Sequence, residues 1–266
     1  MSEPWMIREH SLDVIRGIVD RKIDGLNGPM DIEAAFAAAG KQPAQKASKP
    51  YEMSGDTAII PLMGPLIPKA NLFSRISGAT SYQEVASALS QALADESVSS
   101  IVLSVDSPGG SVQGAFECAQ CVRDARGQKP IVTMADGQCC SAAYLIGCQT
   151  DQIYCSVGAE VGSIGVIWRG MSQDRALANQ GVDQTIIRSS ELKAVGAGPM
   201  TPNQMQSIQA RVNQLFGMFK DQVQAARPIC NIDAVATGET WIGKDAVSMG
   251  LCDGVTTMDK VLKMLA

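Results

Sequence analysis

The chain has 266 residues, of which 45% are hydrophobic and 18% are charged, and its net charge is −5. This length fits one large α/β domain or one and a half average domains, and the composition indicates a packed core rather than a disordered chain. A negative charge without a clustered basic face argues against a nucleic-acid partner. No apolar run approaches the ~18 residues of a membrane span, and the N-terminus lacks the basic-then-apolar layout of a signal peptide, so we expect a cytoplasmic protein.

Residues 1–50 are expected to form an N-terminal helical appendage and linker. Apolar residues at helical spacing predict an amphipathic helix over residues 11–22, and a short alanine-rich helix is expected at Ile32–Ala39. Lys41–Pro50 contains two prolines and three lysines, a composition typical of a linker. The appendage is either a packing arm for self-association or a segment that covers the functional site or is cleaved from it.

From Thr57 onward, strands and helices alternate. We expect strands at Thr57–Met63, Ser100–Val105, Pro130–Ala135, Asp151–Cys155, Gly165–Trp168 and Gln184–Arg188. We expect helices at Tyr82–Ala94, Val112–Arg126, 141–149, Ser172–Gln180 and 202–227, followed by short C-terminal helices that include 257–266. Capping boxes at Ser81–Glu84 and Thr201–Gln204 open the first and the longest of these helices. Such alternation predicts a parallel sheet with right-handed crossovers.

Two strand-to-helix turns carry the residues of a candidate functional site. Ser141 opens a small-residue run after the strand Pro130–Ala135, at a helix start where unsatisfied N–H groups would favour an oxyanion, although serine there is more often a simple N-cap. Gly109 and Gly110 follow the strand Ser100–Val105, and glycines at such a turn allow positive φ and outward-pointing N–H groups. If the two strands are parallel neighbours, both turns meet at the carboxyl edge of the sheet, where α/β sites form.

A nucleophilic serine needs a proton acceptor. The only histidine, His10, lies in the appendage outside the α/β core, which argues against a Ser-His-Asp triad and leaves no ligand cluster for a metal. A lysine can act as the base when burial lowers its pKa from ~10.4 to ~7–8. Lys193 fits this role, because it follows a β-rich run and has apolar residues on both sides, with one acidic neighbour. The alternative is an ordinary surface lysine.

Four motifs, in order and spacing, resemble the signal peptide peptidase A family of S49-type serine peptidases. They are Asp106-Ser-Pro-Gly-Gly110, Ser141-Ala-Ala-Tyr144, Gly162-Ser-Ile-Gly-Val166 and Ser190-Glu-Leu-Lys193. The resemblance covers about residues 57–256 and is nearest to the soluble branch that tailed phages use as prohead (capsid maturation) proteases. It implies a crotonase-like (ClpP-like) spiral α/β fold, with a Ser-Lys peptidase domain over 51–256 that forms homo-oligomers and needs no cofactor.

The resemblance also implies a role for each matching residue. Ser141 would be the nucleophile, Lys193 the general base and Ser163 the hydroxyl that orients the lysine. The N–H of Gly110, in a turn kept open by Gly109, would form the oxyanion hole with the N–H of Ser141 or its neighbour. The substrate would lie extended along strand edges, and its small or apolar side chain before the cleaved bond would meet Ala142, Ala143 and Ile164. In this family the lysine can come from a neighbouring subunit.

Several functions remain open. The expected one is cleavage of scaffold or capsid proteins in the host cytoplasm, or inside the procapsid, during phage head maturation. A bacterial peptidase that degrades signal peptides or membrane proteins is the first alternative, disfavoured because no signal or anchor is seen. A crotonase-type acyl-CoA enzyme is disfavoured because no basic nucleotide site is present. A non-catalytic capsid-assembly component is disfavoured because Ser141 and Lys193 are both intact.

The eight cysteines are expected to be free thiols. Cys118 and Cys121 form a C-x-x-C pattern, but it lies within a helical pattern and has no second pair at zinc-site spacing. Cys139, Cys140, Cys148 and Cys155 lie in expected strand or helix interiors, where a free cysteine behaves as a small apolar residue. We therefore expect buried thiols without disulfides, with Cys140 as a target for thiol reagents beside Ser141.

Overall fold

The computed structural model describes residues 5–7, 49–70, 78–170, 172, 174–183, 185–193, 195–196 and 198–266. The helices expected at 11–22 and 32–39 lie outside these residues, as do His10 and almost all of the expected linker. Within the described ranges, no helix is both long enough and apolar enough to cross a membrane.

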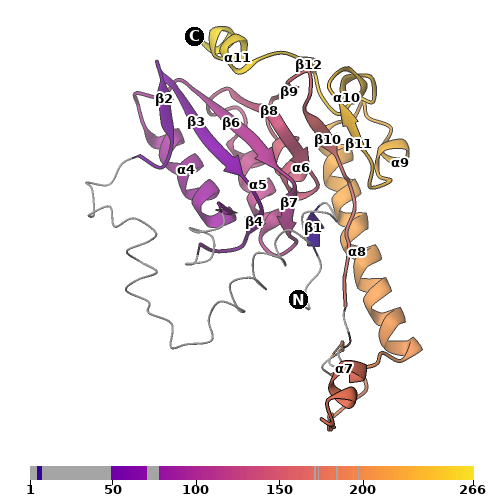
Figure 1. Cartoon of the computed structure of the whole chain (residues 1–266). Coiled ribbons are helices and arrows are strands. Elements are labelled where there is room, and N and C mark those ends of the chain that lie inside the picture. Colours follow the sequence, from indigo (N-terminus) through magenta and orange to yellow (C-terminus); the bar gives the residue numbers. More distant parts are fainter. Residues whose placement is uncertain are drawn as a thin grey trace.

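An eight-stranded, mostly parallel sheet forms the centre of the molecule (Figure 1). Its strands, in spatial order, are β11 (Thr240–Ile242), β10 (Glu160–Gly162), β8 (Ile131–Cys140), β6 (Ser100–Ser107), β3 (Thr57–Met63) and β2 (Glu52–Ser54), with β9 (Gln152–Cys155) and β12 (Gly254–Val255) branching from β8. β3, β6, β8, β9 and β10 pair in parallel, whereas β2 and β11 are antiparallel edge strands. The parallel sheet expected from the alternation of elements is confirmed.

The strand β8 is forked, with two partners on one side. Its residues 132–135 pair with β9, and its residues 138–140 pair with β10. Cys140 lies opposite Gly162 at the end of this second pairing. The fork therefore brings β10 beside the last residue before Ser141.

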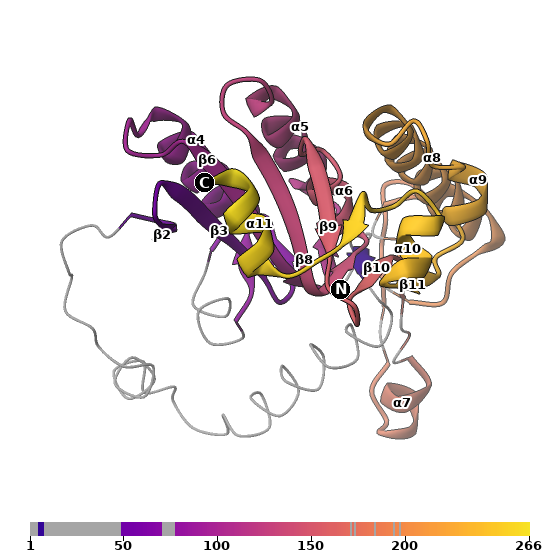
Figure 2. The ribbon, with the colours of Figure 1, turned by 90° about the horizontal axis from the view of Figure 1, so that it is seen from above.

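Helices cover both faces of the sheet (Figure 2). The helices α4 (Tyr82–Ala94), α5 (Ala115–Ala125) and α6 (Ala142–Gly147) share one core with alternate residues of β6, Ile101 and Leu103. Val102 faces the other side and packs with Val261 of α11 (Met258–Leu265). Successive strand residues point to opposite faces, so one apolar strand serves both layers. Each fully buried side chain of this size contributes about 1.5–3 kcal/mol.

A second, smaller sheet adjoins the carboxyl ends of the main strands. Its order is β1 (Trp5–Ile7), β7 (Gly109–Ser111), β4 (Leu66–Ile67) and β5 (Thr80–Ser81). β7 follows β6 almost directly along the chain, so the glycine turn expected after β6 is itself a short strand. β4 pairs with one edge of β7 in parallel, and β1 pairs with the other edge in antiparallel orientation.

The long helix α8 (Pro202–Ala226) is anchored to the body at its C-terminal half and projects from it at its N-terminal half (Figure 1). Phe219 and Val223 are fully buried, and α8 contacts α6. Directly after the helix, the Arg227 guanidinium makes a two-pronged ion pair with Asp253, with N···O distances of 2.9 Å. The short helix α7 (Asp174–Asn179) lies beyond the free end of α8, far from the sheet in both views (Figures 1 and 2).

Most expected elements are confirmed, and two are wrong. β3 and α4 have the expected bounds, and both capping boxes are present. The expected strand Gly165–Trp168 is not formed, since only Ile167 makes an isolated bridge and the strand lies earlier, at β10. Positive φ angles at Gly162 and Ser163 turn the chain out of the sheet after β10. Residues 185–188 are not a strand either, since none of the described strands pairs with them.

Short helices also follow the long one, as expected. They are α9 (Ile232–Val235), α10 (Lys244–Ser248) and α11, the last within the expected range 257–266.

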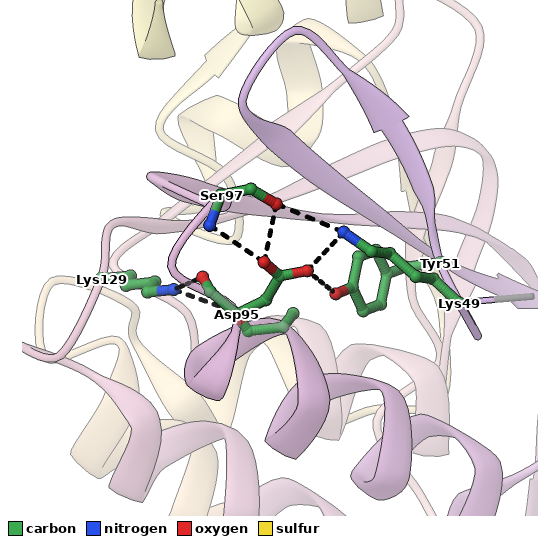
Figure 3. A network of polar contacts seen from close by, with 6 residues as sticks. Lys49, Tyr51, Asp95, Ser97 and Lys129 are labelled. Atoms are coloured by element: carbon green, nitrogen blue, oxygen red, sulfur yellow. Dashed lines mark hydrogen bonds and ion pairs between the residues drawn. The ribbon is translucent and has the colours of Figure 1, made fainter.

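At the amino edge of the sheet, where the parallel strands begin, Asp95 organises a polar cluster with Lys49, Tyr51, Ser97 and Lys129 (Figure 3). We call these five residues the Asp95 cluster. The Asp95 carboxylate accepts hydrogen bonds from Lys49 Nζ (2.5 Å), Tyr51 OH (2.7 Å) and the Ser97 N–H (2.9 Å), and Lys129 Nζ donates to its carbonyl (2.7 Å). The cluster ties the start of β2 to the C-cap of α4.

These contacts shift two pKa values in the Asp95 cluster. The hydrogen bonds from Lys49 first, then from Ser97 and Tyr51, hold the pKa of Asp95 well below its usual range. Burial, together with the hydrogen bond to Asp95 and its charge, raises the pKa of Tyr51 to about 12. At neutral pH the cluster therefore contains an ionised Asp95 and a protonated Tyr51.

Candidate active site

Ser141 lies between the end of β8 and the start of α6, as its N-cap. Its N–H donates to the Gly162 carbonyl at 2.7 Å, and its carbonyl accepts from the Leu145 N–H at 2.9 Å. Its Oγ makes only a long contact, 3.5 Å, to the carbonyl oxygen of Gly165. The residue is 1% exposed. Its backbone is thus firmly held, while its hydroxyl makes no short hydrogen bond to the carbonyl that it faces.

The backbone at Ser141 is strained. Its φ is 55° and its ψ is −118°, and among the described residues only Ser163 is another non-glycine with positive φ, at 52°. Such conformations cost about 1–3 kcal/mol each and persist where the surroundings over-determine them, most often at functional sites. These two serines are the residues that the family resemblance matches to the nucleophile and to the hydroxyl that orients the lysine.

Ser141 and Ser163 are held together by the β8–β10 pairing. The Ser141 N–H bonds to Gly162, the residue before Ser163, and the Ser163 N–H donates to the Glu239 carbonyl at 2.6 Å. Gly162 has a φ of +122°, and a Cβ there would lie 2.9 Å from the Trp241 ring. A glycine is therefore required where the chain turns from β10 toward Ser163.

Gly109 and Gly110 approach Ser141 from β7. Gly109 has a φ of +102°, and a Cβ placed on it would lie 2.9 Å from Cβ of Ser141 and 2.9 Å from the Cys140 carbonyl oxygen. A Cβ on Gly110 would lie 1.9 Å from the Leu66 carbonyl oxygen in β4. Both positions exclude a side chain, and the backbone at Gly109 lies directly against the candidate nucleophile. The structure thus brings the predicted oxyanion-hole glycines and Ser141 together.

Lys193 is not part of this group within one chain. It is an exposed residue in a turn, where its N–H donates to the Ser190 carbonyl at 3.1 Å. Two residues earlier, the backbone carbonyl of Glu191 accepts from Gln204 Nε2 at 2.6 Å, and its carboxylate accepts from Asn203 Nδ2 at 2.8 Å. The turn is thereby fixed to the first turn of α8, the end that projects from the body (Figure 1).

The three predicted substrate-contacting residues lie in the core. Ala142, Ala143 and Ile164 are all 0% exposed. Their lining of a substrate pocket stays a prediction. A cavity of about 470 Å³ lies elsewhere, between α4 and α5, and is lined by residues from Ala86 to Ala94 and from Cys121 to Gln128.

Asp106 joins two strands of the main sheet. Its carboxylate accepts the Gln138 N–H at 2.9 Å and so joins the ends of β6 and β8. Among the described residues, no group of three or more histidines, cysteines or acidic residues is arranged to hold a metal ion.

The cysteines are free thiols, and seven of the eight are buried. Burial raises the pKa of Cys118 and of Cys148 to about 12, so these thiols stay protonated at neutral pH. Cys121 on α5 is the exposed one, which corrects the expectation that the thiols are uniformly buried.

Sequence reasoning missed one neighbour of the site, the strand β1. Met6 of β1 lies opposite Gly110, and a Cβ on Gly109 would lie 2.2 Å from the Met6 carbonyl oxygen. The three residues Trp-Met-Ile lie just after Pro4 and far in sequence from β7, and so short a segment carries no strand signal of its own. Only the paired structure reveals it.

Comparison with known families agrees with this architecture. The Clp protease family matches residues 71–154, which include β6, β7 and Ser141. Together with the parallel sheet, the flanking helices and a strained serine after a central strand, this match defines a ClpP-like α/β protein. The peptidase family S49 matches residues 123–266, which is just over half of the chain. The chain therefore belongs to peptidase family S49.

Two phage proteins and one bacterial protein are among its relatives. The head-tail preconnector protein GP5 of Enterobacteria phage P21 is 30% identical over 87% of this chain and 46% of its own length. The capsid assembly protease C of Escherichia phage lambda is 30% identical over 83% of this chain and 51% of its own length. The probable protease SohB of Haemophilus influenzae is 29% identical over 68% and 51%. The chain thus spans about half the length of these relatives.

Among solved structures, an enoyl-CoA hydratase/isomerase family member aligns with 81% of this chain and 74% of its own. Its TM-score is 0.46 at 15% identity, a likeness too low to support a conclusion about function.

Proposed function

We propose that the chain is a serine endopeptidase with a Ser141–Lys193 dyad, and that it cleaves scaffold or capsid proteins during phage head maturation. The observation that carries the proposal is the grouping of the two strained serines, Ser141 and Ser163, beside the Gly109–Gly110 turn. Acyl transfer needs a positioned nucleophile and backbone N–H groups beside it that can bind an oxyanion. The strained serine after a parallel strand would supply the first, and the glycine turn against it would supply the second.

Each residue has a step in the proposed reaction. Neutral Lys193 takes the proton from Ser141 Oγ as this oxygen attacks the peptide carbonyl, and the Ser163 hydroxyl orients the lysine. The N–H of Gly110 stabilises the oxyanion. Protonated Lys193 then gives its proton to the leaving amine, and water hydrolyses the acyl-enzyme to restore Ser141.

The position of Lys193 favours a dyad formed between two copies of the chain. The turn that holds it is bound to Gln204 at the start of α8, whereas α8 meets the body near Phe219. Fifteen residues of helix separate these two points, which corresponds to roughly 22 Å at 1.5 Å per residue. The lysine of one copy would therefore reach Ser141 of a neighbouring copy.

The free part of α8 offers a surface for that neighbour. Met205 is 49% exposed, and on the adjoining segment Ile187 is 94% and Leu192 is 48% exposed. Apolar side chains gathered on a projecting element are typical of a surface that another subunit covers. A homo-oligomer would bury this surface and complete the site at the same time.

The role in phage head maturation rests on the names of the two phage relatives, one of which is a capsid assembly protease. The SohB relative, a probable protease of a bacterium, supports the alternative of a bacterial peptidase that degrades signal peptides or membrane proteins. The two roles differ in substrate and not in chemistry.

The test compares the parent with Ser141→Ala, Lys193→Ala and the control Lys260→Ala, which alters an exposed lysine on α11. Purified proteins are incubated with casein, with phage scaffold and capsid proteins and with signal peptides, and the fragments are identified by mass. We expect the rate of cleavage to fall at least about 10³-fold in both site variants and to stay unchanged in the control. Equal cleavage by all four proteins would refute the dyad. Cleavage of signal peptides but not of capsid proteins would refute the phage role.

Mixing the two inactive variants tests whether the dyad forms between copies. In a one-to-one mixed oligomer, about a quarter of the sites combine an intact serine with an intact lysine from the neighbouring copy. We expect about a quarter of the parent activity in the mixture. A mixture as inactive as its components would show that both residues act within one chain.

A further inference from the structure

The strand β1 covers the edge of the candidate active site. β7 has β4 on one edge and β1 on the other, and β1 runs antiparallel with Trp5 opposite Ser111, Met6 opposite Gly110 and Ile7 opposite Gly109. An extended peptide that adds to a sheet edge gains backbone hydrogen bonds in just this manner. Residues 5–7 therefore lie where a polypeptide has to lie if its backbone is to meet the oxyanion-hole glycines.

The carbonyl group of Met6 points toward the site. A single Cβ position on Gly109 would be 2.2 Å from the Met6 carbonyl oxygen and 2.9 Å from Cβ of Ser141. Both atoms therefore lie next to Gly109, where only a glycine fits. The Met6 carbonyl thus faces the glycine turn beside the nucleophile.

The side chain of Met6 anchors the strand. It is 0% exposed and belongs to the main hydrophobic core. Ser141, which also lies next to Gly109, is only 1% exposed. A nucleophile that acts on polypeptides has to be reachable by a peptide backbone, and the short strand with its buried methionine lies at this approach.

We propose that residues 5–7 are an internal, substrate-like strand that blocks the β7 edge, with Met6 in the place of the residue before the cleaved bond. External substrates compete with this strand for the same edge. The buried methionine identifies their chemical class: extended polypeptides with a long, unbranched apolar side chain at that position. The proposal rests on the proposed function in that Ser141 is taken as the nucleophile. In a single copy no bond of β1 is broken, because the proposed dyad takes its lysine from a neighbouring copy.

Peptide binding tests the proposal without catalysis. The probe is a fluorescein-labelled peptide with the sequence of residues 3–9, Glu-Pro-Trp-Met-Ile-Arg-Glu, measured by fluorescence polarisation. All proteins carry Ser141→Ala, so that the probe is not hydrolysed. They are otherwise unaltered, or carry Met6→Asp, Ile7→Pro or the control Met53→Asp. Met53 is a partly exposed methionine in β2, an outermost strand of the main sheet that does not pair with β7. Ile7→Pro fixes φ at about −65° and so distorts the paired backbone of β1 without altering the buried methionine, in case Met6→Asp affects folding.

We expect the probe to bind at least about tenfold more tightly to the Met6→Asp and Ile7→Pro proteins. The reason is that a site open for only a fraction of the time shows an affinity reduced by that fraction. The Met53→Asp protein should bind as weakly as the unaltered one, and a probe with aspartate in place of methionine should bind to none. Equal affinity in all proteins, or no binding to any, would overturn the proposal.

Hydrolysis of the same peptide, with Ser141 intact, separates this proposal from the proposed function. If both hold, Met6→Asp raises the rate about as much as it raises the affinity. Binding as expected without hydrolysis by any variant would refute the peptidase function and leave the blocking strand. Ser141-dependent hydrolysis that is unchanged by Met6→Asp and Ile7→Pro would refute the blocking strand and leave the function.

Discussion

The amino and carboxyl edges of the main sheet, that is, the two ends of its parallel strands, are built in opposite ways. At the amino edge, the carboxylate of Asp95 is fully used, since Lys49, Tyr51 and Ser97 all donate to it (Figure 3). At the carboxyl edge, Ser141 has a strained backbone and a hydroxyl with one long contact. The first arrangement satisfies the hydrogen bonds of its polar groups and fixes the start of β2 to the end of α4. The second leaves the Ser141 hydroxyl without a short hydrogen bond, so that it can react.

The strain at the carboxyl edge is maintained by its neighbours. The Ser141 N–H bonds to the Gly162 carbonyl at 2.7 Å, and the Ser163 N–H bonds to the Glu239 carbonyl at 2.6 Å. Each strained residue costs about 1–3 kcal/mol, and the paired strands around it offset that cost. The comparison indicates that residues at one end of the sheet, around Asp95, stabilise the fold. Residues at the other end, around Ser141, serve the function at a cost in stability.

The largest effect is expected when a side chain is added at the carboxyl edge. Gly110→Ala would place a Cβ 1.9 Å from the Leu66 carbonyl oxygen, so the backbone of β4 has to shift. We expect a loss of about 3 kcal/mol in the free energy of unfolding, together with the loss of peptidase activity. Urea denaturation and peptide hydrolysis measure the two effects.

The matched control lies at the amino edge. Gly55 has a φ of +62°, and a Cβ there would meet nothing within 4 Å. Gly55→Ala therefore suffers only from its backbone conformation, at about 1 kcal/mol, and should keep full activity. Equal destabilisation by both substitutions would show that the close packing of β7 against β4 contributes nothing to stability.

The second prediction separates stability from activity at a single residue. Ser141→Gly removes the nucleophile and also relieves the positive φ of 55°, which glycine adopts freely. We expect activity to fall to background while the free energy of unfolding rises by about 1 kcal/mol. The control Ser104→Gly, in the middle of β6, should lower stability by about 1 kcal/mol, because that strand position has no strain to relieve. A drop in stability for Ser141→Gly would contradict the assigned strain.

The sequence predicted the elements whose signals are local. Strand β3 and helix α4 have their expected ends because alternation, a capping box and helical spacing all lie within a few residues. The grouping of Ser141 with Gly109 and Gly110 also followed, since parallel neighbouring strands bring their carboxyl ends together.

The features that the sequence did not predict depend on distant partners. The positive φ of Ser163 results from pairing with the chain near Glu239, which no local pattern encodes. Strand β1 exists only because β7 offers an edge about a hundred residues away in the sequence. The position of Lys193 depends on where α8 leaves the body, so periodicity alone does not place it.

The third prediction concerns pH and the amino edge. The pKa of Asp95 is held below its ordinary value of 3.8, first by the hydrogen bond from Lys49. A carboxylate with a lowered pKa in the folded state stabilises the protein above its ordinary pKa, and this contribution is lost as the pH falls below about 4. We expect Asp95→Asn to lower the melting temperature at pH 7, and the difference from the parent to shrink as the pH is lowered below 4. Activity at pH 7 should be unchanged. A difference independent of pH would show that the charge of Asp95 does not matter.

The smallest effect is expected from the thiols. Cys140 is 0% exposed although it precedes Ser141, whereas Cys121 is exposed on α5 beside the cavity between α4 and α5. A thiol reagent such as N-ethylmaleimide should therefore add once per chain, at Cys121, and leave peptidase activity unchanged. Cys121→Ser should prevent the addition, as intact mass would show. Modification of Cys140 with loss of activity would mean that the carboxyl edge opens to small molecules even while β1 lies on β7.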